Sequence, residues 1–162
     1  MNRKIKFRGK SKKTRKWLYG YLGESKFSIL DYVYTDKVIF DNVLSFNTDN
    51  SAYVVKDLSV EEDTIGQFTG LHDKNGTDIY EGDILMCIGE RNDNKGRKYY
   101  RKVLFNNGAF GMTVPEYKCI SALCNHVVNG KLNWEVIGNI YDNPEFLDEK
   151  LWFHLRAFLR AM

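Results

Sequence analysis

Acidic and amide side chains gather in residues 69–85 (TGLHDKNGTDIYEGDIL), and their oxygens are the ligands that Ca²⁺ prefers. The candidate ligands are Asp73, Asn75, Asp78, Glu81 and Asp83. Their spacing differs from the EF-hand loop, in which glycine is sixth and a glutamate closes the loop at the twelfth position. We favour a structural turn in which Asp73 accepts backbone hydrogen bonds, Gly76 takes the left-handed conformation and Gly82 bends the returning strand. We expect no metal here.

A second candidate site is the cysteine and histidine pattern Cys119-x4-Cys124-x-His126, with Cys87 elsewhere in the chain. Thiolate and imidazole are zinc ligands, but the paired CxxC knuckle is missing and the residues between the two cysteines are apolar. Buried structural thiols are therefore the favoured interpretation. Three cysteines without a repeated spacing also predict reduced thiols and no disulfide framework.

A third pattern, Glu116-Tyr117-Lys118, matches the ExK half of a metal-dependent nuclease, in which a carboxylate holds Mg²⁺ and a lysine stabilises developing charge. The preceding acidic ligand of such a site has no identifiable counterpart. The chain has no phosphate-binding loop, nucleophile elbow or HExxH motif. We therefore assign no catalytic residue and no cofactor, and a metal-dependent nuclease is the third hypothesis for function.

Basic residues are concentrated near the start of the chain. The net charge is only +3, yet nine of the 24 Lys and Arg residues precede the first acid, Glu24. The candidate nucleic-acid ligands are Arg3, Lys4, Lys6, Arg8, Lys10, Lys12, Lys13, Arg15 and Lys16, with Lys98 and Arg101 in a later basic and aromatic stretch. These cations are suited to phosphate backbones. They are equally suited to a solvated strand, or to pairing with acidic faces of the same fold.

The elements that would position these residues are mostly strands. Residues 3–8 alternate, with Ile5 and Phe7 on one face, and residues 16–23 form the second strand of a hairpin. Further strands are predicted at 27–34, 37–46, 52–58, 99–105, 109–114 and 131–140. Asn106-Asn107-Gly108 predicts a tight hairpin turn, Gly138 a bend or a bulge, and Ser59 the cap of a short helical turn.

The end of the chain changes to a helical period over residues 143–162. Asn143 is suited to the cap and Pro144 to the first helical position. The apolar stripe supplies the candidate oligomer contacts Leu151, Trp152, Leu155, Phe158 and Leu159. This amphipathic helix is predicted to pack either on the body, residues 1–142, or on another subunit.

The pattern as a whole predicts a single mainly β domain: a compact barrel-like or sandwich-like body of short antiparallel strands with one C-terminal amphipathic helix. No run of about 18 apolar residues exists to span a membrane, and the N-terminus lacks the apolar run of a signal peptide. We expect a cytoplasmic protein with no membrane partner.

Three segments together resemble the recurrent blocks of the YopX proteins of bacterial phages and prophages: IKFRGKSKKTRKWLYGYL, IGQFTGLHDKNGTDIYEGDIL and EVIGNIYDNPEFL. The resemblance implies a mainly β phage or prophage protein in the cytoplasm of a bacterial host, and it carries no catalytic residue across. The leading hypothesis is a non-catalytic accessory protein that acts as a binding or self-assembling module. The alternative is a nucleic-acid-binding protein that uses the basic N-terminal segment.

Overall fold

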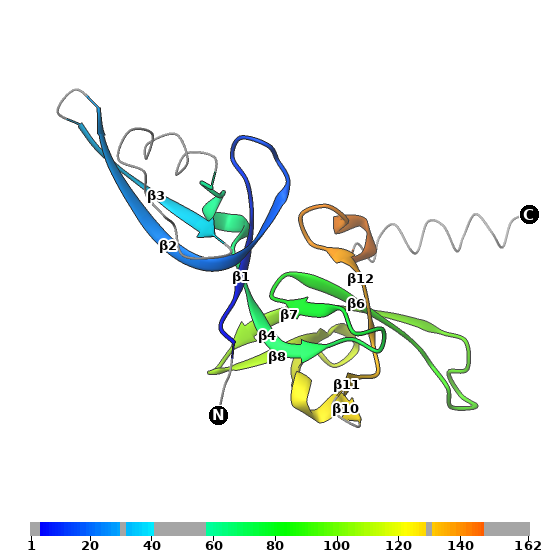
Figure 1. The fold of residues 1–162 in the computed structure, drawn as a ribbon. Coiled ribbons are helices and arrows are strands. Elements are labelled where there is room, and N and C mark those ends of the chain that lie inside the picture. Colours follow the sequence, from blue (N-terminus) through cyan, green and yellow to red (C-terminus); the bar gives the residue numbers. More distant parts are fainter. Residues whose placement is uncertain (1–3, 30–31, 41–57, 129–130, 148–162) are drawn as a thin grey trace, which may run out of the picture. The chain divides into compact units, whose positions relative to one another are not determined.

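The computed structural model describes residues 4–29, 32–40, 58–128 and 131–147 (Figure 1). The chain divides into two compact units, Met1–Gly70 and Leu71–Met162. Strands dominate the described residues of both units, which confirms the predicted mainly β class. The single body over residues 1–142 stays a prediction, because a division into compact units does not decide whether either unit folds alone.

The first unit is built on a long hairpin beside a short N-terminal strand. Its elements are β1 (Phe7–Lys10), β2 (Trp17–Ile29), β3 (Tyr32–Phe40), the 3-10 helix η1 (Glu62–Thr64) and the start of β4 (Gly66–His72). The hydrogen-bonded strand order is β3-β2-β1-β4-β5, and β2 and β3 pair from Tyr21↔Phe40 to Ile29↔Tyr32. Figure 1 shows this hairpin as a long curved ribbon.

One face of the β1–β2 ladder packs inward because Gly9 leaves room for neighbouring side chains. A Cβ atom at Gly9 would lie 3.0 Å from the Ile39 Cδ1 and from the Val60 Cβ. Ile39 and Val60 are buried at 1% and 0% exposure. Since strand residues alternate between faces, Arg8 and Lys10 must lie on the opposite face from Gly9.

The second unit contains an open five-stranded antiparallel sheet with the order β12-β6-β7-β8-β9 and a two-stranded ribbon. The strands are β5 (Asp78–Tyr80), β6 (Asp83–Ile88), β7 (Lys98–Asn106), β8 (Ala109–Val114), β9 (Cys119–Ala122), β10 (Val127–Val128), β11 (Lys131–Leu132) and β12 (Glu135–Asn139). Three single 3-10 turns complete it: η2 (Pro115–Tyr117), η3 (Leu123–His126) and η4 (Pro144–Leu147).

The core of the second unit is formed by six buried side chains, each at most 1% exposed. They are Ile79, Leu85, Val103, Met112, Leu123 and Leu132. They come from β5, β6, β7, β8, η3 and β11, so the core joins segments that are far apart in the sequence. Burial of this apolar surface is the main source of stability of such a unit.

The predicted barrel is wrong for the described residues, because the two larger sheets are open ladders with different strands at their ends. Gly82, with φ +82°, does bend the chain sharply. The bend, however, carries the chain from β5 in one sheet to β6 in the other. The Tyr80 amide donates to the buried Asp83 carboxylate at 2.7 Å and holds this corner.

The predicted C-terminal helix is not confirmed. The described part of the chain contains no long helix, and residues 144–147 form only the turn η4. The rest of the predicted helix, with Leu151, Trp152, Leu155, Phe158 and Leu159, lies outside the described residues. Within the described part, no helix is long and apolar enough to cross a membrane.

Local predictions had mixed outcomes. The Asn106-Asn107-Gly108 turn is confirmed, with Asn107 and Gly108 at positive φ between β7 and β8. The bulge at Gly138 is confirmed by a register shift between β12 and β6. The described residues of the predicted strand at 27–34 are strand, but they belong to two elements, the end of β2 and the start of β3. Ser59 is also not a helix cap: it bridges Val38, and η1 begins after Glu61 without a side-chain cap.

Of the other predicted strands, residues 37–40 lie in β3, whereas residues 41–57 lie outside the described residues.

Candidate functional site

Cations and aromatic rings share one face of the first unit, which we call the basic-aromatic face. In the β1–β2 register, Arg8 pairs with Tyr19 and Lys10 with Trp17. Tyr21 lies two residues beyond Tyr19 and therefore on the same side of β2. Tyr19 and Tyr21 are 50% and 51% exposed. The alternation of β1 and β2 thus gathers basic residues beside two half-exposed rings.

Cation–π contacts organise this face. The Arg8 guanidinium carbon lies 4.9 Å from the centre of the Trp17 ring, and the Lys10 ammonium lies 5.9 Å from the same centre. The Lys6 ammonium lies 5.1 Å from the centre of the Phe68 ring on β4. Arg8 is only 5% exposed, so its guanidinium packs beneath the face, against the Trp17 ring.

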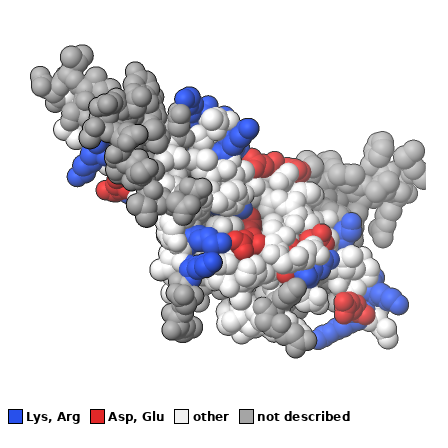
Figure 2. Space-filling view, in the orientation of Figure 1, with Lys and Arg blue, Asp and Glu red and all other residues white. Residues whose placement is uncertain are grey.

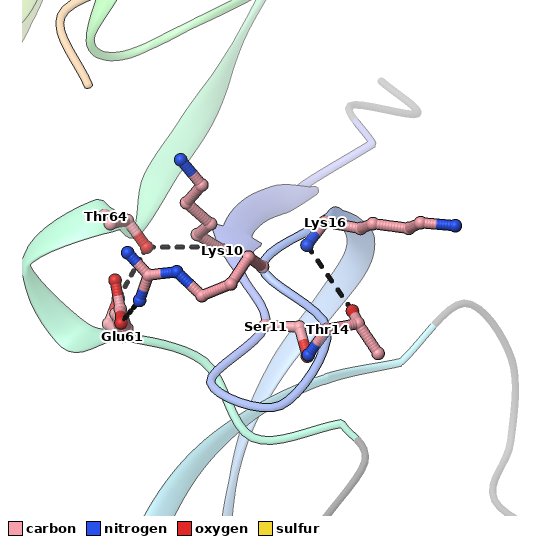
Figure 3. A network of polar contacts seen from close by, with 7 residues as sticks. Lys10, Ser11, Thr14, Lys16, Glu61 and Thr64 are labelled. Atoms are coloured by element: carbon pink, nitrogen blue, oxygen red, sulfur yellow. Dashed lines mark hydrogen bonds and ion pairs between the residues drawn. The ribbon is translucent and has the colours of Figure 1, made fainter. Parts of the chain in front are cut away.

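The turn that joins β1 to β2 is fixed by a buried serine (Figure 3). The Ser11 hydroxyl is fully buried and accepts a hydrogen bond from the Thr14 amide at 3.1 Å. Arg15 adopts a left-handed conformation with φ +60°, and its amide donates to the Ser11 carbonyl at 3.0 Å. The Lys10 amide donates to the Thr64 hydroxyl at 2.8 Å, which ties the end of β1 to η1.

Two cations of this turn pair with acids of the same unit. The Lys12 ammonium contacts the Asp36 carboxylate, and the Arg15 guanidinium contacts the Glu61 carboxylate. Figure 2 shows one face of the molecule, where Lys and Arg lie in small groups interspersed with Asp and Glu. Some of the predicted cations therefore pair with acids of the same fold, whereas nucleic-acid binding by the others stays a prediction.

The remaining predicted ligands of the N-terminal segment differ in position. Lys4, Lys13 and Lys16 are exposed. Arg3 lies outside the described residues.

The later basic stretch belongs to the second unit. Lys98 is exposed at the start of β7, whereas Arg101 is only 7% exposed. The Arg101 guanidinium carbon lies 5.3 Å from the centre of the Tyr99 ring and 5.8 Å from that of Trp134, and the group donates to the Tyr100 carbonyl at 2.9 Å. Burial makes Arg101 part of the packing and leaves Lys98 as the accessible cation of the pair.

The sequence interpretation missed a polar cluster around Arg101. The Ser121 hydroxyl and the His126 Nε2 lie 2.9 Å apart, and the imidazole meets the Trp134 ring edge-on. Burial and the Arg101 charge hold the pKa of His126 below its ordinary value. Burial raises the pKa of the half-buried Cys87 thiol, against an opposing effect of Arg101. No sequence spacing indicates this cluster, because β6, β7, β9, η3 and the residue before β12 meet only in the folded unit.

The acidic stretch that resembled a metal loop contains a buried turn. Asp73 is fully buried, and its Oδ1 accepts from the amides of Asn75 and Thr77, each at 2.8 Å. Its Oδ2 accepts from the amide of Val136 on β12 at 3.0 Å. Burial raises the pKa of Asp73, but the three backbone N–H groups together hold it below its ordinary value. Gly76 closes the turn with φ +90°.

The other metal patterns have no converging ligands in the structure. The described residues contain no group of three His, Cys, Asp or Glu side chains placed to hold a metal ion. The prediction that the cysteines are buried is wrong for Cys119 and Cys124, which are exposed on the end strand β9 and on η3.

The ExK pattern lies in a turn. Glu116 is within η2, and Lys118 follows it in a left-handed conformation. The pattern therefore lacks the extended strand in which residues two apart share a face.

The comparison with protein-family models agrees with the resemblance seen in the three sequence blocks. The family model described as YopX protein matches residues 6–148. No curated protein matches the chain. Among solved structures, protein EF1440 from Enterococcus faecalis is 23% identical, with a TM-score of 0.47, over 91% of this chain and 100% of that one. Since the family model covers most of the sequence, the chain belongs to the YopX family.

Proposed function

We propose that this chain is a non-catalytic accessory protein of a phage or prophage, which acts as a binding or self-assembling module in the cytoplasm of a bacterial host. The family membership supports the phage setting, as the resemblance implied. The exposed start of β3 supports the binding role. A nuclease is not proposed, because its candidate Glu116 and Lys118 lie in a turn.

The observation that carries the proposal is the exposure of apolar side chains on β3. Tyr32, Val33 and Tyr34 are 70%, 69% and 48% exposed. Residues 32–35 are all exposed, and consecutive strand residues point to opposite faces, so this part of β3 is accessible on both faces. β3 is also the end strand in its sheet order. Apolar end strands of this kind are common sites of strand pairing between chains.

A second copy of the chain fits this strand. The Ile39 amide donates to the Leu58 carbonyl and the Val60 amide to the Lys37 carbonyl, so the outer edge of β3 is occupied from residue 37 onward. Antiparallel pairing about a two-fold axis at Tyr34 would use residues 32–36 and place Tyr34 opposite its copy. Aromatic pairs across strands stabilise such ladders, and a two-fold interface is self-complementary.

Multi-angle light scattering of the full chain tests the proposal. We expect a dimer that becomes a monomer in the double variant Tyr32→Lys, Val33→Lys. Tyr117→Lys is the matched control, because Tyr117 is 80% exposed on η2 of the second unit and should leave the dimer unchanged. A chain that is monomeric at every concentration tested would contradict self-assembly.

The earlier predicted contacts, Leu151, Trp152, Leu155, Phe158 and Leu159, remain a separate hypothesis. If a truncation after Asn143 leaves the number of subunits per assembly unchanged, the C-terminal segment does not take part in assembly. A truncation that yields monomers while Tyr32→Lys, Val33→Lys remains dimeric would move the interface from β3 to the C-terminal segment.

A further inference from the structure

We infer that the basic-aromatic face of the first unit binds single-stranded nucleic acid, with Tyr19 and Tyr21 as the stacking rings. The inference rests on the proposed role as a binding module and names a ligand for it. It concerns a different surface from residues 32–36 of β3, so the two can be tested separately.

The register of three strands places the relevant side chains together. Arg8 pairs with Tyr19 on β2 and with Gly66 on β4, which puts β1 between the two strands. The Lys6 ammonium lies over the Phe68 ring, so β4 contributes to the same face as Arg8 and Tyr19. Gly66 adds no side chain beside Arg8. The face therefore combines cations and rings from β4, β1 and β2, with Arg8 and Phe68 buried at 5% and 6% exposure.

The net positive charge of the chain lies in this unit. Residues 1–70 contain 12 Lys and Arg against 9 Asp and Glu, whereas residues 71–162 contain 12 of each. The whole net charge of +3 therefore belongs to the first unit. A cation that contacts a phosphate releases counterions, which drives binding to nucleic acid at low salt. Lys6 and Lys10 are only partly buried and flank the rings, so their ammonium groups can reach a phosphate backbone beside stacked bases.

The two tyrosines are suited to unpaired bases. Exposed aromatic side chains beside cations are the common device by which proteins bind single strands without sequence preference. Tyr19 and Tyr21 are two residues apart on one strand, which is about 7 Å along its axis. That distance is about twice the rise of about 3.4 Å per nucleotide in a B-form strand. A base that stacks on either ring must give up a stacking contact with a neighbouring base, which the paired and stacked bases inside an intact duplex cannot do.

The neighbouring ring contacts favour this arrangement. The Tyr21 ring lies 6.3 Å from the Phe40 ring on β3, and Trp17 is held under Arg8 and Lys10. Both contacts restrict the rings next to Tyr19, so less freedom is lost when bases stack. The ion pairs of Lys12 and Arg15 anchor the adjoining turn, which sets the direction in which β2 leaves it.

Fluorescence anisotropy with the full chain tests the inference. The ligands are a mixed-sequence single-stranded DNA, an RNA of the same sequence and the corresponding DNA duplex. We expect binding to at least one single strand and weaker binding to the duplex. Tyr19→Ala and Tyr21→Ala should each weaken single-strand binding roughly 5- to 150-fold, the effect of one lost base stack. The matched control is Tyr117→Ala in the second unit, which should bind as the parent chain does.

A salt titration separates phosphate contact from nonspecific adhesion. The logarithm of the binding constant should fall with the logarithm of salt, and Lys10→Gln should reduce the slope by about 0.7 for one lost phosphate contact. Absence of single-strand binding, equal affinity for the duplex, or equal affinity of the tyrosine variants would overturn the inference. If the chain is still a dimer in that case, the proposed module stands and only its ligand is wrong.

Discussion

The two compact units differ in the polar groups that they bury and in the rings that they expose. In the first unit, Tyr19, Tyr21 and Tyr32 are half or more exposed, and cations lie among the rings. In the second unit, six apolar side chains form a closed core, while Asp73 and Arg101 are buried and hydrogen-bonded. Under the proposals above, the first unit presents a surface for partners, whereas buried polar groups of the second unit bond strands that are distant in the sequence.

The largest effect is expected from the variant Asp73→Ala. The change leaves three backbone N–H groups without their carboxylate acceptor, and we expect a loss of about 3–5 kcal/mol of unfolding free energy. Urea unfolding measures it, and hydrogen exchange at the amides of Asn75, Thr77 and Val136 should accelerate. Oligonucleotide binding by any protein that remains folded should be unchanged, since the face lies in the first unit.

The same residue predicts an acid dependence. Because the folded pKa of Asp73 lies below its ordinary value of 3.8, the carboxylate stabilises the fold above that pH, and the contribution is lost as the pH falls through the folded value. Asp73→Asn should lack this part of the acid transition. An unchanged transition in Asp73→Asn would assign it to other carboxylates.

A second test compares the two buried arginines. Arg101→Met should cost about 2 kcal/mol, since its guanidinium lies near the Tyr99 and Trp134 rings and donates to the Tyr100 carbonyl. Arg8→Met should cost about 1 kcal/mol, since its guanidinium lies over the Trp17 ring. NMR titration adds a distinct readout: the pKa of His126 should rise in Arg101→Met, yet stay below its ordinary value because burial persists. Arg8→Met should leave His126 unchanged. A His126 pKa that is equal in all three chains would show that burial alone determines it.

Two variants in the turn at residues 73–78 separate the effect of backbone conformation from that of an acidic side chain. Gly76→Val should cost about 1–3 kcal/mol, because valine is strained at φ +90°. Asp78→Ala should cost about 0.5 kcal/mol, since Asp78 is partly exposed and pairs with His72 near the surface. Thermal unfolding compares the two. If Asp78→Ala lost more unfolding free energy than Gly76→Val, residues 69–85 would again be a candidate binding site.

The smallest expected effect is that of a surface ion pair in the first unit. Arg15→Gln removes the contact with Glu61, and Arg15 is 61% exposed, so we expect a loss below about 1 kcal/mol. Added salt should reduce the difference between the parent chain and the variant. If Arg15→Gln lost as much unfolding free energy as Asp73→Ala, the expected difference between exposed and buried charged groups would be wrong.

Sequence predicted those features whose cause is local. The Asn106-Asn107-Gly108 turn and the bulge at Gly138 follow from backbone conformations that few residues adopt, so their signals lie within a few positions. The division of residues 27–34 between two strands was missed, because FSILDYVY contains no glycine, proline or asparagine to mark a turn. The barrel was wrong because a bend at Gly82 does not specify which strand the chain joins next.

The basic N-terminal segment shows the same limit at the candidate site. Sequence identified its cations, but only the strand register distinguishes Arg8, buried over Trp17, from Lys12, paired with Asp36. Arg101 and His126 were not connected at all, because their proximity depends on the packing of β7 against η3 and Trp134.

By itself, the sequence determined the family, the mainly β class and the glycine turns, because these depend on local residue types and their order. Tertiary structure alone decided that the chain divides into two units, which cations are buried and which rings are exposed. The physical reason is that burial and pairing are set by residues distant in the chain: the carboxylate of Asp73 finds its third donor at Val136.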